Sequence, residues 1–207
     1  KSAKRTPMDP ERAGTQSRIE RLEEVAAELE TVDDEATIYE RAVTAADELV
    51  SIDACGVFTA EDGRLVPRAA TDSVLHVDAT LRSTDSGIAG RTVETGRTQV
   101  VDDVRADEAA DPSREAYRSA ISIPLGEDGV VQLIATEPNA FDETDREIAE
   151  LLADHVDHAL DRVRYEAAVE RERDRFVALF QNVPDAAVQY TVADGEPVID
   201  RVNSAFV

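Results

Sequence analysis

Nine residues in the middle of the chain have side chains and spacing suited to a small-molecule binding site. They are Asp85, Ser86, Gly87, Ile88, Arg91, Asp102, Tyr117, Arg118 and Ser119. Gly87 lets a ligand approach the backbone, and amide groups at the start of a helix favour anions or hydrogen-bond acceptors. Arg91 and Arg118 can add charge-assisted hydrogen bonds. The alternative is a collapsed pocket in which both arginines pair with the chain's own carboxylates, and the residues leave the two alternatives open.

Other residue types that often do chemistry favour structural roles here. Cys55 is the single cysteine, and it lies in an apolar segment without an adjoining cation, so we expect a buried, inert thiol. His155 and His158 are three residues apart on one predicted helix, but a metal needs ligands from a second element, so we expect no metal site. His76 lies in an irregular loop and is expected to be an ordinary loop residue rather than a haem ligand. We find no phosphate-binding loop or kinase motif, and therefore expect no cofactor and no catalysis.

The charge of the chain excludes several classes of partner. Asp and Glu number 45 against 22 Lys and Arg, which gives a formal net charge of −23. Nucleic acids and anionic membrane surfaces recruit cationic groups, so we expect neither as a partner. Only Lys1 and Lys4 are lysines. Acidity spread along the whole chain with so little lysine is typical of a protein that works in concentrated salt, where self-repulsion is screened.

The two ends of the chain carry no targeting or membrane signal. No apolar run approaches the roughly 18 residues that span a bilayer. The basic start Lys1–Arg5 is followed by prolines and acids rather than by an apolar stretch, which excludes a signal peptide. We therefore expect a cytoplasmic protein. Because the chain begins with Lys1 and stops at Val207 inside a patterned segment, we also expect it to be a fragment.

Periodicity predicts helices on both sides of a set of short strands. After a flexible leader over residues 1–14, an apolar stripe predicts a coiled-coil-like helix over 15–33, and Ile38–Leu49 continues as a second helix. Short apolar runs separated by Gly-containing turns predict five strands. These strands cover residues 54–60, 64–70, 98–101, 120–125 and 130–136.

Two further helices have recognisable ends. Ser86 is expected to cap a short helix that Gly96 ends in the left-handed conformation. Asp142 is expected to cap a long helix whose apolar stripe reaches Val163. The stripe then fades into a charged helical linker over residues 164–175. Residues 176–207 predict a helical turn and one hairpin, which cannot bury a core alone, so this tail is expected to open a second domain.

The order of these elements and four motifs resemble a GAF domain over residues 34–163. The motifs are Ser86–Gly96, Val100–Val104, Ser119–Leu125 and Phe141–Leu152. The tail over residues 176–207 is similar to the start of a PAS domain, through Phe180–Asp185 and Val202–Phe206. The tandem resembles the PAS/GAF sensor proteins of haloarchaea, most of which are histidine kinases.

The resemblance implies an α+β fold, with an antiparallel sheet of about six strands and the N- and C-terminal helices packed on one face. It also implies a long exit helix, an incomplete PAS-like tail, a small-molecule pocket on the other face and frequent homodimers. GAF domains that reduce methionine sulfoxide use several cysteines, whereas this chain has one. The motif of cyclic-nucleotide-binding GAF domains is only partly matched, since Ala140 replaces its lysine and Arg146 its closing acid.

We therefore predict a non-catalytic, cytoplasmic sensory and signal-relay segment of a two-component sensor histidine kinase. The alternatives are a dimerisation spacer without a ligand, or the regulatory region of a helix-turn-helix transcription regulator. A homodimer is predicted through the apolar stripes of the N- and C-terminal helices. These stripes are Ile19–Leu29, Ile38–Leu49 and Leu152–Val163.

Overall fold

The chain divides into two compact units, Lys1–Asp161 and Arg162–Val207. The computed structural model describes residues 10–71, 82–84, 86–108, 110, 112, 114–193 and 195–206. Among these residues, no helix is both long enough and apolar enough to cross a membrane.

The first unit is built on a six-stranded antiparallel sheet. Its strands are β1 (Ala54–Glu61), β2 (Arg64–Ala70), β3 (Arg82–Ser83), β4 (Gln99–Val101), β5 (Ser119–Leu125) and β6 (Gly129–Ala135), in the order β3-β2-β1-β6-β5-β4. Two tight hairpins join neighbouring strands. Asp62 and Gly63 have φ values of 50° and 75°, which give the β1–β2 turn the twist that neighbouring strands require.

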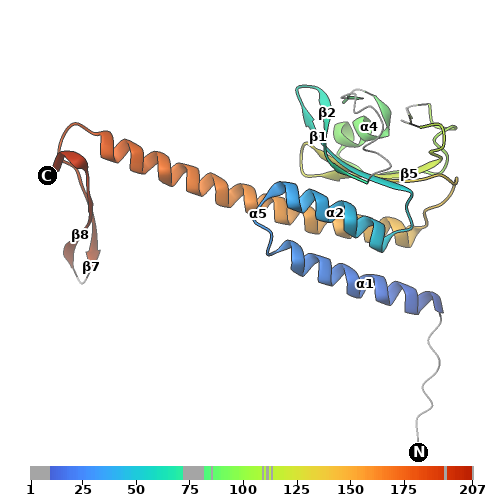
Figure 1. Ribbon diagram of the computed structural model, residues 1–207, viewed down its shortest axis with the longest axis horizontal. Helices are drawn as coiled ribbons and strands as arrows, with labels where there is room; N and C mark the ends of the chain where they lie inside the picture. The colour runs from blue at the N-terminus through green and yellow to red at the C-terminus, as the bar shows by residue number, and fades with distance from the viewer. Residues whose placement is uncertain are drawn as a thin grey trace, which may run out of the picture. The chain divides into compact units, whose positions relative to one another are not determined.

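Helices cover both faces of this sheet. Figure 1 shows α4 (Gly87–Thr95) on one face, with α2 (Glu35–Leu49) and the first part of α5 (Glu143–Asn182) on the other. The helix α1 (Pro10–Leu29) lies beside α2. The predicted α+β fold, with about six strands and helices from both ends of the domain on one face, is confirmed.

Polar contacts fix the end of α2 and the start of α5. Asp142 and Asp145 each accept a hydrogen bond from the other's backbone N–H, which caps the start of α5 as predicted. Arg18 of α1 donates from Nε to the carbonyl oxygen of Leu49 and from Nη2 to Asp145, each at 2.6 Å. One α1 side chain therefore ties together the end of α2 and the start of α5.

The apolar stripes predicted to form a dimer interface are instead largely buried inside the chain. Val25 of α1, Ile38 of α2 and Leu152 and Val156 of α5 are at most 3 % exposed. The same stripe spacing serves a helix that faces its own sheet and a helix that faces a partner, so the sequence pattern alone did not separate the two. These side chains belong to the core of the first unit.

One predicted boundary is wrong. The helix α1 begins at Pro10, inside the segment assigned to a flexible leader, and proline is well suited to the first turn because its missing N–H has no helical partner there. Residues 1–9 lie outside the described residues. The helix α5 runs without a break to Asn182, through the predicted helical linker over residues 164–175 and the helical turn predicted after it.

The second unit contains the end of α5 and one hairpin of β7 (Val188–Ala193) and β8 (Glu196–Val202), followed by the short helix η1 (Ser204–Phe206). Asn203 is 1 % exposed and holds the base of this hairpin. Its amide nitrogen Nδ2 donates to the carbonyl oxygens of Val183 and Asp185, and its Oδ1 accepts from the N–H of Ala187. Almost all side chains of the two strands are exposed.

Candidate functional site

The candidate site is built around α4, where two glycines have structural tasks. Gly87 has φ of 76°, a conformation that side chains other than glycine rarely adopt. A Cβ atom on Gly90 would lie 2.3 Å from the carbonyl oxygen of Thr84, so α4 packs directly on that backbone. Ser86 occupies the N-cap position as predicted, but its side chain makes no capping hydrogen bond. Gly96 ends the helix in the predicted left-handed conformation.

Arg91 points its charge at the loop between β4 and β5. Its Nη1 and Nη2 donate to the two carboxylate oxygens of Asp107 at 3.3 and 2.8 Å. Its Nε is buried and has no hydrogen-bond partner among the described residues. One edge of the guanidinium is therefore occupied by Asp107, while the other still lacks an acceptor.

Arg118 makes a second bidentate pair with the same loop. Its Nε and Nη2 donate to the carboxylate of Asp103 at 3.1 and 2.6 Å. Asp103 also accepts from the N–H of Arg105. These hydrogen bonds, that of Arg118 first, hold the pKa of the Asp103 carboxyl below its ordinary value. The β4–β5 loop is thus fastened to α4 at Asp107 and to the start of β5 at Asp103.

The same elements also bury a small apolar cluster and one hydrogen-bonded pair of hydroxyl groups. Ile88, Val101, Val104 and Ala120 are buried together. Thr92, which is fully buried, places its hydroxyl 2.8 Å from Ser122 Oγ in β5 and 2.9 Å from the carbonyl oxygen of Ile88. The hydroxyls of Thr92 and Ser122 therefore connect α4 to the sheet.

The remaining predicted site residues divide into buried and exposed groups. Tyr117 is 5 % exposed, and its hydroxyl has no hydrogen-bond partner among the described residues. Ser119 is buried and donates to the carbonyl oxygen of Glu137 at 2.7 Å, which commits its hydroxyl to the fold. Asp102 is exposed, and its carbonyl oxygen accepts from the N–H of Asn139. Asp85 lies outside the described residues.

The prediction missed four residues that shape this site, namely Asp103, Asp107, Thr92 and Ser122. The acidic character of the loop over residues 102–117 was evident from the sequence, but spacing does not say which carboxylate meets which arginine. Thr92 gives a weak signal as a polar residue on the apolar face of a short helix. Ser122 gives a similar one, because it stands among apolar residues in its strand.

The other candidates for chemistry are structural or isolated. Cys55 is fully buried, and burial raises the pKa of its thiol to about 12. His155 and His158 are both exposed on α5. Within the described ranges, no group of three or more His, Cys, Asp or Glu side chains is placed to hold a metal ion. His76 lies outside those ranges.

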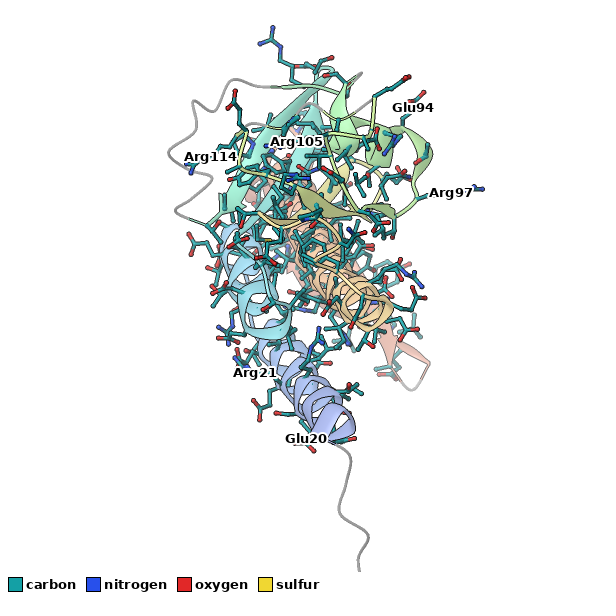
Figure 2. The ribbon with its side chains drawn as sticks, turned by 90° about the vertical axis from the view of Figure 1, so that its right-hand side faces the viewer. Glu20, Arg21, Glu94, Arg97, Arg105 and Arg114 are labelled. Atoms are coloured by element: carbon teal, nitrogen blue, oxygen red, sulfur yellow. The ribbon has the colours of Figure 1, made fainter. Side chains whose placement is uncertain are left out.

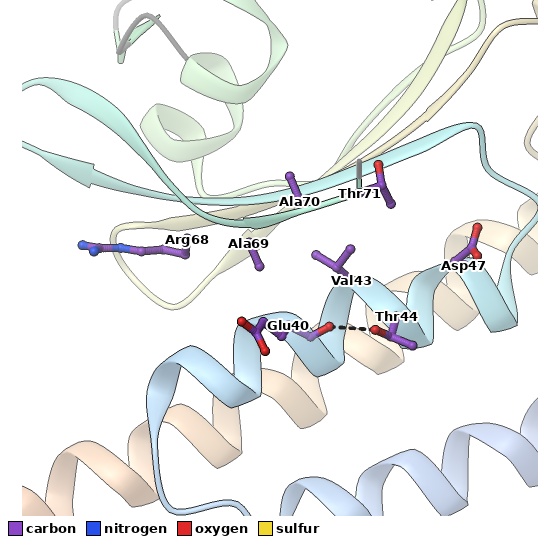
Figure 3. A pocket seen from close by; sticks show the side chains of 8 residues that line it. All are labelled: Glu40, Val43, Thr44, Asp47, Arg68, Ala69, Ala70 and Thr71. Carbon is purple, nitrogen blue, oxygen red and sulfur yellow. Dashed lines mark hydrogen bonds between the residues drawn. The ribbon is translucent and has the colours of Figure 1, made fainter. Parts of the chain in front are cut away.

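A separate hollow of about 520 Å³ lies between α2 and β2 (Figure 3). It is lined by Glu40, Val43, Thr44, Asp47, Arg68, Ala69, Ala70 and Thr71. Its one cation, Arg68, already pairs with Glu61 and donates to Thr59 Oγ1, both in β1. Glu40 and Asp47 stand almost two turns apart on α2, so polar groups do not converge here as they do beside α4.

Comparisons with known proteins agree with this architecture. A family model for the GAF domain matches residues 32–161. The free methionine-R-sulfoxide reductase from Neisseria meningitidis, solved in complex with its substrate, superposes with a TM-score of 0.67 at 19 % identity and covers 80 % of this chain and 98 % of its own.

Two more solved structures have the same fold. The GAF domain of a phosphoenolpyruvate-protein phosphotransferase from Coxiella burnetii gives a TM-score of 0.65 at 19 % identity, over 74 % of this chain and 98 % of that one. Its counterpart from Acinetobacter gives 0.63 at 15 % identity, over 74 % and 96 %. A search of curated proteins finds no match.

Proposed function

We propose, from the premise that this chain belongs to the GAF domain family, that it is a non-catalytic sensory and signal-relay segment. GAF domains are ligand-binding regulatory and sensory domains. In this proposal, a small molecule that carries an anion or another hydrogen-bond acceptor binds beside α4 at Arg91. Its binding biases the packing of the helices on the opposite face of the sheet, and a chemical step is not involved.

The observation that carries this proposal is the unsatisfied edge of Arg91. A buried donor without an acceptor costs about 1–3 kcal/mol, and charged groups cost more. Nε of Arg91 is such a donor among the described residues, and the buried Tyr117 hydroxyl is a second polar group in the same condition. A carboxylate or phosphate oxygen at Nε would remove this cost, so this arrangement of Arg91 favours an anionic ligand.

The properties of Cys55 support a non-catalytic role. One of the similar folds is that of a free methionine-R-sulfoxide reductase. GAF domains with that activity use several cysteines. This chain has one cysteine, which is buried, and its thiol has a pKa of about 12. A thiol that is protonated at neutral pH and shielded from solvent is a poor nucleophile.

The same proposal places the domain in a larger signalling protein. The tail over residues 176–207, in which Asn203 is buried at the base of the hairpin, is similar in sequence to the start of a PAS domain. We infer a cytoplasmic sensor histidine kinase that works as a homodimer. The net charge of −23 with only two lysines supports a haloarchaeal, salt-rich setting.

One observation favours a spacer module without a ligand as the second candidate. Arg91 and Arg118 both already hold carboxylates from the chain itself, at Asp107 and Asp103. If these pairs satisfy both arginines, the domain connects its neighbouring domains, or relays a signal between them, without binding a ligand.

Thermal unfolding in high salt, with a panel of small carboxylates, phosphates and cyclic nucleotides, separates the two candidates. The sensory proposal predicts that at least one anion raises the melting temperature, and that Arg91→Ala removes this shift. Arg97→Ala is the matched control, because Arg97 follows α4 and points away from the sheet (Figure 2). A panel without any shift, or a shift that survives in Arg91→Ala, contradicts the sensory proposal and favours the spacer.

A further inference from the structure

The hollow between α2 and β2 has the size of a small-molecule site, and it lies on the face of the sheet opposite to α4 (Figure 1). Its volume of about 520 Å³ falls within the range of such sites, which is about 300–1,000 Å³. Both walls, α2 and the end of β2, belong to the first unit. The hollow is therefore separate from the site at Arg91.

The four lining residues of α2 form one row along that helix. Glu40, Val43, Thr44 and Asp47 are spaced at i, i+3, i+4 and i+7, and residues with this spacing share one helical face. Val43 is buried in the middle of the row, whereas Glu40 and Asp47 are exposed at its two ends (Figure 3). At a rise of about 1.5 Å per residue, the two acidic residues stand about 10 Å apart along the helix axis.

The wall from β2 has small side chains opposite this row. Ala69 and Ala70 are both half-buried, and Figure 3 shows Ala69 pointing toward Val43 of α2. A larger apolar side chain at position 69 would fill the space that alanine leaves. The floor between the two carboxylates is therefore apolar and open.

The polar groups of the hollow that remain available are acceptors. Within the described part of the chain, the carboxylates of Glu40 and Asp47 have no hydrogen-bond or ion-pair partner. Arg68, the cation that lines the hollow, is paired with Glu61. The hydroxyl of Thr44 donates to the carbonyl oxygen of Glu40, which leaves the lone pairs of its own oxygen as acceptors.

We propose that this hollow binds a linear aliphatic diamine or polyamine. One ammonium group donates to Glu40 and a second to Asp47, while the methylene chain between them lies over Val43 and Ala69. Because the carboxylates stand at opposite ends of the hollow, a compact cation reaches only one of them at a time. An anion is repelled by both. The hollow therefore selects its ligand by length as well as by charge.

The apolar floor separates this site from the general acidity of the chain. A net charge of −23 attracts every cation, and salt screens such exposed attraction. Burial of methylene groups against Val43 and Ala69 is not screened in this way. A diamine should therefore remain bound at salt concentrations that displace Mg²⁺ from the surface.

Methyl NMR titration of the full chain in high salt tests the proposal with three probes. They are 1,8-diaminooctane, octylamine, which has the same chain with one ammonium group, and Mg²⁺, which has the same charge without a chain. We expect 1,8-diaminooctane to shift the methyl signals of Val43 and Ala69 with roughly fivefold higher affinity than either other probe, since only it makes both ion pairs. Glu40→Gln and Asp47→Asn should each lower its affinity to that of octylamine.

Two further variants separate the site from non-specific attraction. Glu94 is exposed on α4, on the other face of the sheet, so Glu94→Gln makes the same change of charge and should leave the affinity unchanged (Figure 2). Ala69→Leu fills the floor without a change of charge and should abolish the shift at Val43.

Three results would overturn the proposal. They are equal affinity for the three probes, an equal loss of affinity in Glu94→Gln, and the absence of any shift at Val43 and Ala69. Each of them leaves the sensory proposal standing, because that proposal is read from the melting shift that an anion causes through Arg91.

Discussion

Arg91 of α4 holds Asp107 of the β4–β5 loop in a two-bonded ion pair, with N–O distances of 2.8 and 3.3 Å. The loop carboxylate thus occupies one edge of the guanidinium on which the proposed ligand depends. Because Arg118 holds Asp103 in the same way, the loop is attached at two points. A ligand oxygen at Nε of Arg91 would bind beside Asp107 and leave both attachments of the loop in place.

The buried hydroxyl pair of Thr92 and Ser122 is expected to stabilise the attachment of α4 to the sheet. Thr92→Val leaves the Ser122 hydroxyl buried without this partner, so we expect a loss of about 1–3 kcal/mol in the free energy of unfolding, measured with urea. Thr95→Val is the control, since Thr95 is exposed on the same helix, and it should stay within about 0.5 kcal/mol of wild type. Equal losses of unfolding free energy in both variants would show that the hydrogen bond between Thr92 and Ser122 does not stabilise the fold.

Two glycines should respond to alanine with opposite signs. Gly90→Ala places a Cβ 2.3 Å from the Thr84 carbonyl oxygen, and we expect it to cost about 1–3 kcal/mol through overpacking. Gly14 lies in α1 with nothing within 4 Å of its Cβ position, so Gly14→Ala should stabilise the chain by about 0.5–1 kcal/mol. Calorimetric melting of both variants checks this. A stabilised Gly90→Ala variant would mean that α4 does not pack on Thr84.

The Asp103 carboxyl gives a test by pH. Its folded pKa lies below the ordinary value of 3.8, so its pair stabilises the fold above that value and loses this contribution as the pH falls through the folded pKa. Arg118→Ala removes the main cause, and the Asp103 pKa should rise toward 3.8 in an NMR titration. Arg97 is remote from the pair of Asp103 and Arg118, so Arg97→Ala should leave the pKa of Asp103 low. An unchanged pKa in Arg118→Ala would assign the shift to another group.

Much of the fold was predictable because its signals are local. The turn at Asp62-Gly63, the left-handed Gly96 and the cap at Asp142 each follow from the conformational preference of one or two residues. The start of α1 was not predictable to the same degree. Pro10 suits the first helical turn, but the segment from Pro10 to Gly14 has no apolar period, so periodicity did not place the helix start there.

The candidate site was predictable as a set of residues but not as a set of pairs. Arg91 and Arg118 were identified, and the alternative in which they pair with carboxylates was open at the sequence level. Their partners Asp107 and Asp103 are 16 and 15 residues away, and only the path of the loop between β4 and β5 brings them together. Loop paths depend on tertiary contacts that spacing does not encode.

The apolar stripe of α5 shows the same limit in a different form. Leu152 and Leu151 are neighbours on α5, yet one is buried in the core and the other is half exposed. Both leucines lie on stripes with helical spacing, so periodicity alone would predict burial for the more apolar stripe. Only the position of the sheet shows which of the two stripes is buried.

Calorimetric titration of the anion found by thermal unfolding is the most direct test of the sensory account. Wild type and Arg97→Lys are expected to bind it with equal affinity. Arg91→Lys keeps the charge but loses the planar guanidinium that bonds Asp107 and a ligand together, so its affinity should fall by about tenfold or more. Equal affinity in Arg91→Lys, or the absence of heat with every anion of the panel, would contradict a sensory site at α4.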